Sequence, residues 1–111
     1  MENTTKIKSF SDLIAWKESH KLVLMIYEIT KLFPKRESFG LTNQICRAVV
    51  SITSNIAEGF SRNSAKEKTH FYAISLGSLT EVENQLFISN QITTVNRLIH
   101  GLMKTARDRH T

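Results

Sequence analysis

The apolar residues of this chain recur every three or four positions in four separate stretches, which is the spacing of α-helices that bury one face. These stretches begin near residues 11, 39 or 41, 64 and 93. Only four Gly and one Pro occur in 111 residues, too few for the turns of a small β-sandwich or barrel. At 41% hydrophobic residues, the chain is too apolar for a disordered tail. We expect an all-α protein with a flexible N-terminus over residues 1–10 and a single domain over residues 11–108.

Local signals mark the ends of the predicted helices. Ser11 can cap the first helix, which ends before Pro34, and Gly59 suits the end of the second. Ser64 and Glu67 match a capping box, in which each side chain satisfies a free backbone donor of the other residue at a helix start. Short connections make successive helices antiparallel. The sequence therefore predicts an up-down-up-down antiparallel four-helix bundle.

The first helix carries two adjacent apolar stripes. The members of the first are Leu13, Trp16, His20, Val23 and Tyr27, and those of the second are Leu22, Ile26, Ile29 and Phe33. Together they make a face wider than one neighbour would cover, so this helix is expected to touch two helices of its own bundle or another subunit. His20, on an apolar stripe, is expected to be a satisfied, partly buried side chain.

Close contact between helices is expected around the third stretch. Gly77 lies in mid-helix and costs about 1 kcal/mol relative to Ala unless close packing compensates. Small residues of the second helix would also permit close approach, namely Ser51, Ser54 and Ala57.

No constellation of residues in the sequence predicts catalysis. Glu67 and His70 have a spacing used in di-iron bundles, but the pair occurs once and Glu67 already serves as a capping residue. Cys46 lies among apolar residues with no His nearby in sequence, and is interpreted as a buried thiol. No phosphate-binding Gly loop, nucleophile elbow or paired zinc-type Cys is present. We expect no enzyme activity, no metal and no cofactor.

The compartment is also predicted from composition. No run approaches the roughly 18 apolar residues of a membrane span, and residues 1–10 do not resemble an export signal. The single Cys46 cannot form an internal disulfide. We expect a cytoplasmic protein with no membrane partner.

Two polar lines run along the second and third helices. The first contains Gln44, Arg47, Ser51, Asn55 and Glu58, and the second contains Ser75, Ser78, Glu81 and Gln85. One interpretation is two solvated faces. The other is that the lines meet each other or a neighbouring subunit, with hydrogen bonds among Arg47, Asn55, Glu58 and Glu81 fixing the register.

A formal net charge of +5 at neutral pH makes polyanions plausible partners. The candidate nucleic-acid-binding residues lie in the first two connections, as Lys35 and Arg36, then Arg62, Lys66 and Lys68. In an antiparallel bundle these connections lie at opposite ends, so a monomer would bind weakly, whereas a ring of subunits would repeat each patch. The alternative is that these residues only confer solubility. Lys104, Arg107 and Arg109 are explained by the dipole of the last helix.

The chain resembles a known family in several motifs. They are Phe10-Ser-Asp-Leu-Ile-Ala-Trp16-Lys, Phe33-Pro34, residues 37–48, Ser51-Ile-Thr-Ser-Asn55-Ile-Ala-Glu58-Gly59 and Gly77-Ser78-Leu79-Thr-Glu81. This pattern is similar to that of the four-helix-bundle proteins encoded in intervening sequences of bacterial 23S ribosomal RNA genes. That family includes the accessory variability determinant of diversity-generating retroelements. The likeness covers about residues 9–107 and departs after Gln91, where the usual Gly-Tyr-containing turn is absent.

The resemblance implies a homopentameric ring of four-helix bundles with no known catalytic activity. Its retroelement members bind nucleic acid and a partner reverse transcriptase. The family positions that this chain matches are candidate assembly residues, namely Trp16, Gln44, Arg47, Asn55, Glu58 and Glu81. We therefore expect a noncatalytic scaffold that binds RNA or DNA through repeated basic patches. The alternative is a protein-interaction module, for example for a reverse transcriptase, with no direct role in nucleic-acid binding.

Overall fold

The computed structural model describes residues 6–37 and 40–109, with side chains described over residues 6–36 and 40–88 and at Leu102. Three α-helices make up most of this part: α1 (Ile14–Thr30), α2 (Leu41–Ser61) and α3 (Ala65–Arg109). Two short 3-10 helices, η2 (Phe10–Asp12) and η3 (Lys35–Glu37), precede α1 and α2. The described residues contain no β-strand, so the predicted all-α class is confirmed.

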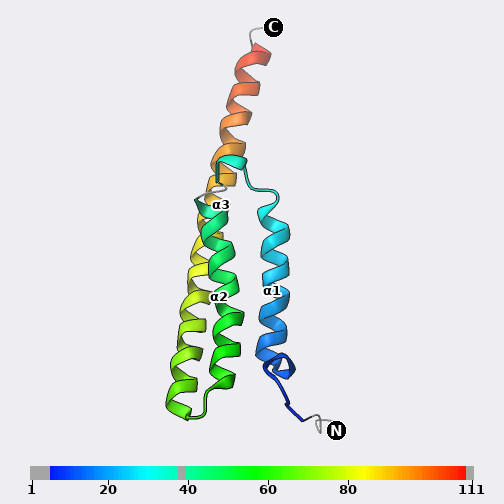
Figure 1. Cartoon of the computed structure of the whole chain (residues 1–111). Coiled ribbons are helices and arrows are strands. Elements are labelled where there is room, and N and C mark those ends of the chain that lie inside the picture. Colours follow the sequence, from blue (N-terminus) through cyan, green and yellow to red (C-terminus); the bar gives the residue numbers. More distant parts are fainter. Residues whose placement is uncertain (1–5, 38–39, 110–111) are drawn as a thin grey trace.

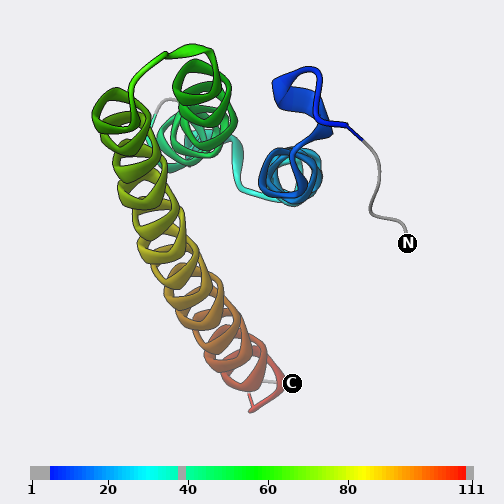
Figure 2. The same ribbon diagram turned by 90° about the horizontal axis from the view of Figure 1, so that it is seen from below.

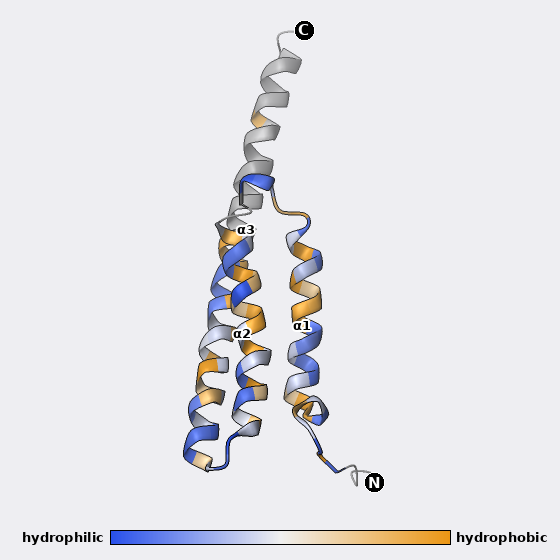
Figure 3. Cartoon of the chain, viewed as in Figure 1, coloured by the Kyte–Doolittle hydropathy of each residue, from blue (hydrophilic) through white to orange (hydrophobic). Residues whose placement is uncertain are grey.

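Helix α2 lies between the other two helices and runs antiparallel to both (Figures 1 and 2). The core forms along α2 because its apolar residues recur at helical spacing. Figure 3 shows apolar residues along the space between α1 and α2. Ile26 of α1 and Val82 of α3 complete the buried cluster, whose α2 members are Ile45, Ala48, Val49, Ile52 and Ile56.

The start of α1 differs from the prediction for Ser11. Ser11 lies inside η2, α1 begins at Ile14, and its N-cap residue, Leu13, makes no side-chain capping bond. The capping carboxylate belongs instead to Asp12, which accepts hydrogen bonds from the backbone N–H groups of Lys8 (2.8 Å) and Ser9 (3.1 Å). These two bonds, that of Lys8 first, hold the pKa of Asp12 below its ordinary value of 3.8.

The connection between α2 and α3 follows the capping signal at Ser64. The Ser64 hydroxyl oxygen accepts a hydrogen bond from the backbone N–H of Glu67 (3.1 Å). Helix α3 begins at Ala65, directly after Ser64, as predicted. The Glu67 carboxylate accepts a hydrogen bond from the Ser64 hydroxyl (3.3 Å). In a full capping box this carboxylate would accept from the backbone N–H of Ser64.

The structure differs from the predictions for two glycines. Gly59 is buried inside α2, which continues to Ser61, and a Cβ atom there would lie 2.6 Å from the Tyr72 ring. Gly59 therefore allows α2 and α3 to approach closely. The close packing predicted at Gly77 is wrong within the described residues, since nothing there lies within 4 Å of the position of its missing Cβ.

Helix α3 is more than twice as long as α2. It spans 45 residues, about 67 Å at 1.5 Å per residue, and continues through the predicted connection near residue 91 without a break. The predicted count of four helices is therefore not confirmed. The radius of gyration is 19.8 Å, against about 13 Å for a compact domain of roughly 100 residues, because the end of α3 extends beyond α1 and α2 (Figure 1).

Candidate functional site

The two predicted polar lines meet along the contact between α2 and α3. The hydroxyl groups of Ser51 and Ser78 lie 2.8 Å apart, and the Gln85 amide donates to the Gln44 side-chain oxygen at 3.5 Å. The buried Ser75 hydroxyl donates to the backbone carbonyl of Ile52 (2.9 Å). These bonds join α2 to α3, so the interpretation in which the lines meet each other is confirmed for this contact.

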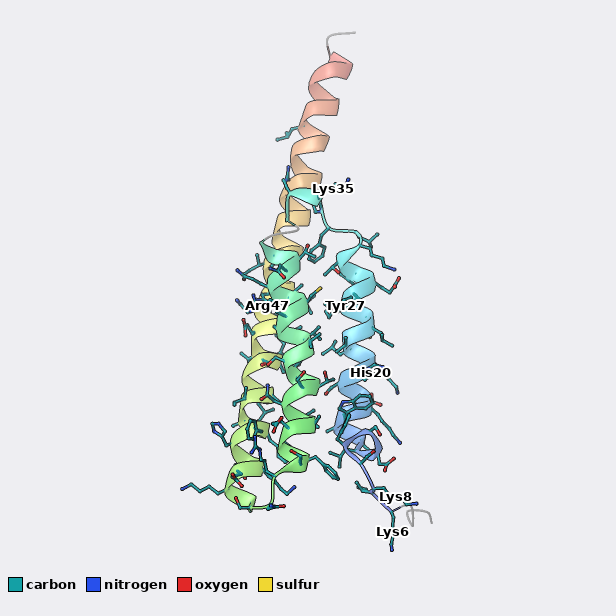
Figure 4. All side chains as sticks on the ribbon, in the orientation of Figure 1. Lys6, Lys8, His20, Tyr27, Lys35 and Arg47 are labelled. Atoms are coloured by element: carbon teal, nitrogen blue, oxygen red, sulfur yellow. The ribbon has the colours of Figure 1, made fainter. Side chains whose placement is uncertain are left out.

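The four side chains expected to hydrogen-bond to one another do not do so within the described structure. Asn55 donates to the Ser51 carbonyl (2.8 Å) and hydroxyl (3.0 Å), and Glu58 forms an ion pair with Arg62 (2.7 Å). Arg47 and Glu81 are exposed and line one hollow of about 340 Å³ between α2 and α3. The outer face of α2 therefore presents a guanidinium surrounded by short polar side chains (Figure 4).

Trp16 has a packing role at the start of α1. Its ring stacks on that of His20, with centroids 4.8 Å apart and planes 8° apart, and meets the Phe10 ring edge to face at 5.4 Å. Trp16 also packs against the core. His20, labelled in Figure 4, is exposed, so the predicted partial burial is wrong.

The five candidate basic residues lie at the two ends of the molecule, as expected. Lys35 and Arg36 are exposed in η3, at one end, and Lys66 is exposed at the other (Figures 1 and 4). Arg62 and Lys68 stabilise the connection between α2 and α3. Besides its ion pair, Arg62 lies 4.8 Å from the Phe71 ring centroid, and Lys68 donates to the Phe60 carbonyl at 2.8 Å.

Two further cations, outside the predicted set, lie at one of these ends. Lys6 and Lys8 are exposed and lie at the same end as the connection between α2 and α3 (Figure 4). They were assigned to a flexible N-terminus, although the spacing of Ser9 and Asp12 is itself a capping signal. The backbone of Lys8 is held by Asp12. This end of the chain therefore carries Lys6, Lys8 and Lys66 together with Arg62 and Lys68.

The residues considered above for metal binding or nucleophilic chemistry, Cys46, Glu67 and His70, have structural contacts. Cys46 is half-buried, and its sulfur lies 3.8 Å from the Thr30 hydroxyl. Glu67 is engaged by Ser64, and the His70 ring packs against the edge of Phe71. Among the residues the structure describes, no three His, Cys, Asp or Glu side chains gather as metal ligands would. None of the helices searched within that part could cross a membrane.

The described structure has an apolar groove of about 620 Å³. It lies between the N-terminal part of α1 and α3, with α2 as its floor, and we call it the α1–α3 groove. Its apolar lining includes Leu13, Ile52, Ile56, Tyr72, Leu76 and Leu79, and Glu18 is its only carboxylate. Leu76 is 66% exposed although it faces this groove. Exposed apolar side chains gathered in one groove mark a candidate interaction site.

Comparison with known proteins gives one family. The model of the 23S rRNA-intervening sequence protein family matches residues 11–107, which includes α1, α2, both polar lines and α3 up to residue 107. No curated protein matches the chain.

Proposed function

Because the chain belongs to the 23S rRNA-intervening sequence protein family, we propose that it is a noncatalytic helical scaffold that self-assembles and binds RNA or DNA. The proposal includes a four-helix bundle, with residues 93–108 as the fourth helix, and a homopentamer in the cytoplasm that needs no cofactor. The observation that carries it is the distribution of surface chemistry on a single chain. The apolar α1–α3 groove is open, whereas the cations are divided between the two ends.

Assembly connects these two features. Covering exposed apolar surface favours association by about 25 cal/mol for each Å² removed from water. Association also repeats every cationic end, and the affinity for a polyanion rises steeply with the number of phosphates contacted. A single chain with a net charge of +5 would bind weakly, so the assembled form is the one expected to bind.

The test uses exposed cations that support no other part of the fold. We would measure binding to a mixed RNA pool at several salt concentrations for the chain carrying Arg36→Gln and Lys66→Gln. Arg62 and Lys68 are left intact because they stabilise the connection between α2 and α3. The matched control carries Lys21→Gln and Lys31→Gln, which remove the same charge from exposed ion pairs on α1.

The expected result is weaker binding and a shallower salt dependence for the first variant than for the control, because phosphate contacts set both quantities. The loss should be similar for RNAs of different sequence. Absence of binding to the pool at low salt would refute the nucleic-acid part of the proposal.

The second candidate is a protein-interaction module, and the apolar α1–α3 groove favours it. Such a groove could accept an amphipathic helix from another protein, for example a reverse transcriptase, with the basic charge incidental. Pull-down with and without nuclease distinguishes the candidates. Partners lost after nuclease treatment indicate a scaffold for nucleic acid, and partners retained indicate direct contact between proteins.

A further inference from the structure

We propose that residues 90–109 of one copy of this chain occupy the α1–α3 groove of a second copy, so that each bundle is completed by a helix from its neighbour. This inference rests on the proposed self-assembly and on the fourth-helix assignment. It is independent of nucleic-acid binding.

The α1–α3 groove has the position of a missing helix. Both α1 and α3 pack on α2, yet over the part of the chain that the structure describes no Cα atom of α1 lies within 8 Å of one in α3. In an antiparallel four-helix bundle the fourth helix contacts the first and third. The floor and walls of the groove are apolar, as an inward helix face requires.

The free end of α3 is longer than the groove. The lining of the groove comes from residues 13–19, from Ile52 and Ile56, and from residues 72–79, which is about 10 Å of helix at 1.5 Å per residue. Residues 90–109 lie within α3, and by the same rise these twenty or so residues extend about 30 Å. One such segment is therefore long enough to cover the groove of a neighbouring copy.

A continuous α3 cannot place this segment in the groove of its own chain. Among the residues whose side chains are described, Gln85 and Leu86 are the members of α3 farthest along the helix that contact α2 or the core, near the start of α2. Beyond them α3 continues past η3 and away from the bundle (Figure 1). With α3 unbroken, the segment that fits the groove must come from another copy.

The sequence of α3 also indicates two different sets of neighbours. Leu79, Val82 and Leu86 are followed sixteen positions later by three further apolar residues, Val95, Leu98 and Leu102. In a continuous α-helix, positions sixteen apart are offset by about 160°, so the second stripe starts on nearly the opposite face. One straight helix cannot place both stripes against the same partners. Leu102 is 71% exposed in the single chain, as expected for a residue whose partner is a second copy.

Charge and symmetry agree with the exchange. Three cations lie near the end of the segment, Lys104, Arg107 and Arg109, and the described lining of the groove contains one carboxylate, Glu18, which is exposed and in the single chain pairs with Lys21. Each copy offers one segment and one groove, so exchange closes either between two copies or around a ring. No groove is left open in either arrangement.

The experiment is cysteine cross-linking in the full-length chain. With Cys46→Ser as background, Leu79→Cys places a thiol at the groove and Leu102→Cys places one on the segment. A short bifunctional maleimide is added, and the products are sized under denaturing conditions. A matched control replaces the groove thiol with Leu24→Cys, because Leu24 is 56% exposed on α1 and does not line the groove.

Exchange between chains predicts covalent dimers, or a ladder of larger products if exchange runs around a ring, and at least a fivefold lower yield for the control. A product of single-chain mass with an internal cross-link would overturn the proposal, because the segment would then fill its own groove. Absence of cross-linking would overturn it too, provided that circular dichroism shows the variant to be as helical as the parent. RNA binding is measured on the same samples. Its presence or absence tests the proposed nucleic-acid function and leaves the result of the cross-linking unchanged.

Discussion

Replacing Gly59 and Gly77 by alanine should change stability in opposite directions. Both glycines lie inside helices, so both substitutions gain the same helix propensity, about 1 kcal/mol. Their surroundings differ. A Cβ atom at Gly59 would lie 2.6 Å and 2.9 Å from two atoms of the Tyr72 ring and 3.2 Å from the Phe71 Cβ. The Tyr72 ring can turn, but the Phe71 Cβ moves only with the backbone of α3.

The magnitude follows from the cost of overpacking. An extra methyl group in a well-packed contact costs about 1–3 kcal/mol. Gly59→Ala should therefore lower the free energy of unfolding by up to about 2 kcal/mol after the gain in helix propensity. Gly77→Ala meets nothing within 4 Å among the described residues and should raise it by about 1 kcal/mol. Because the propensity gain cancels, the difference between the variants isolates the clash at Gly59.

Urea unfolding followed by far-UV circular dichroism measures this difference. All variants must be compared at one protein concentration, since self-association makes the midpoint depend on it. The midpoint of Gly59→Ala should lie below that of the parent, and that of Gly77→Ala above it. If Gly59→Ala unfolds at the same urea concentration as Gly77→Ala, the conclusion that α2 and α3 leave no room for a Cβ atom at Gly59 is refuted.

Three other substitutions test the core, the interhelical hydrogen bond and the acid response. Ile45→Ala should cost about 2–5 kcal/mol in urea unfolding because Ile45 is fully buried, and a cost equal to that of Leu24→Ala, at an exposed site, would contradict the assigned core. Ser75→Ala should cost about 1 kcal/mol in the same assay by removing the bond to Ile52, and no loss would mean that the bond does not hold α3 to α2. The ionised Asp12 carboxylate, which accepts the Lys8 and Ser9 backbone hydrogen bonds, stabilises η2 fully above pH 3.8, the ordinary pKa of this group. This contribution is lost as the pH falls through the lower pKa that Asp12 has in the folded chain. NMR titration should show the Lys8 and Ser9 amides shifting together below pH 3.8 in the parent but not in Asp12→Asn, and a transition that survives the substitution would refute the assignment.

Much of the helical framework could be predicted from the sequence, because apolar spacing and capping chemistry are local. The apolar residues of α2 from Ile45 to Ile56 are buried on one face, as the helical spacing of that stretch predicts, and α3 begins directly after Ser64. The first capping residue was misplaced because Ser11 and Asp12 are both good caps, and only the spacing from Ser9 to Asp12 distinguishes them.

The end of α3 could not be predicted from periodicity alone. Between Gly77 and Gly101 no Gly or Pro interrupts the chain, so nothing local stops the helix near residue 91, although the apolar stripe changes face there. The role of Gly59 was missed for a related reason. A glycine near a helix end has the same sequence signature whether it ends the helix or admits a neighbouring ring.

The candidate basic residues were placed correctly at the two ends, but their contacts depend on packing between helices. Arg62 and Lys68 hold the connection between α2 and α3 because Phe71 and the Phe60 carbonyl lie within their reach, which the spacing of charges does not reveal. Lys6 and Lys8 could have been included had the capping signal at Ser9 been followed.

The most direct test of this account is the mass of the intact protein in solution, because the account treats a single chain as an incomplete unit with an open groove. Sedimentation equilibrium over a range of low micromolar concentrations at neutral pH should give a mass that is a whole multiple of 12.7 kDa, two or more. A mass of 12.7 kDa at every concentration, with the protein fully helical, would contradict it.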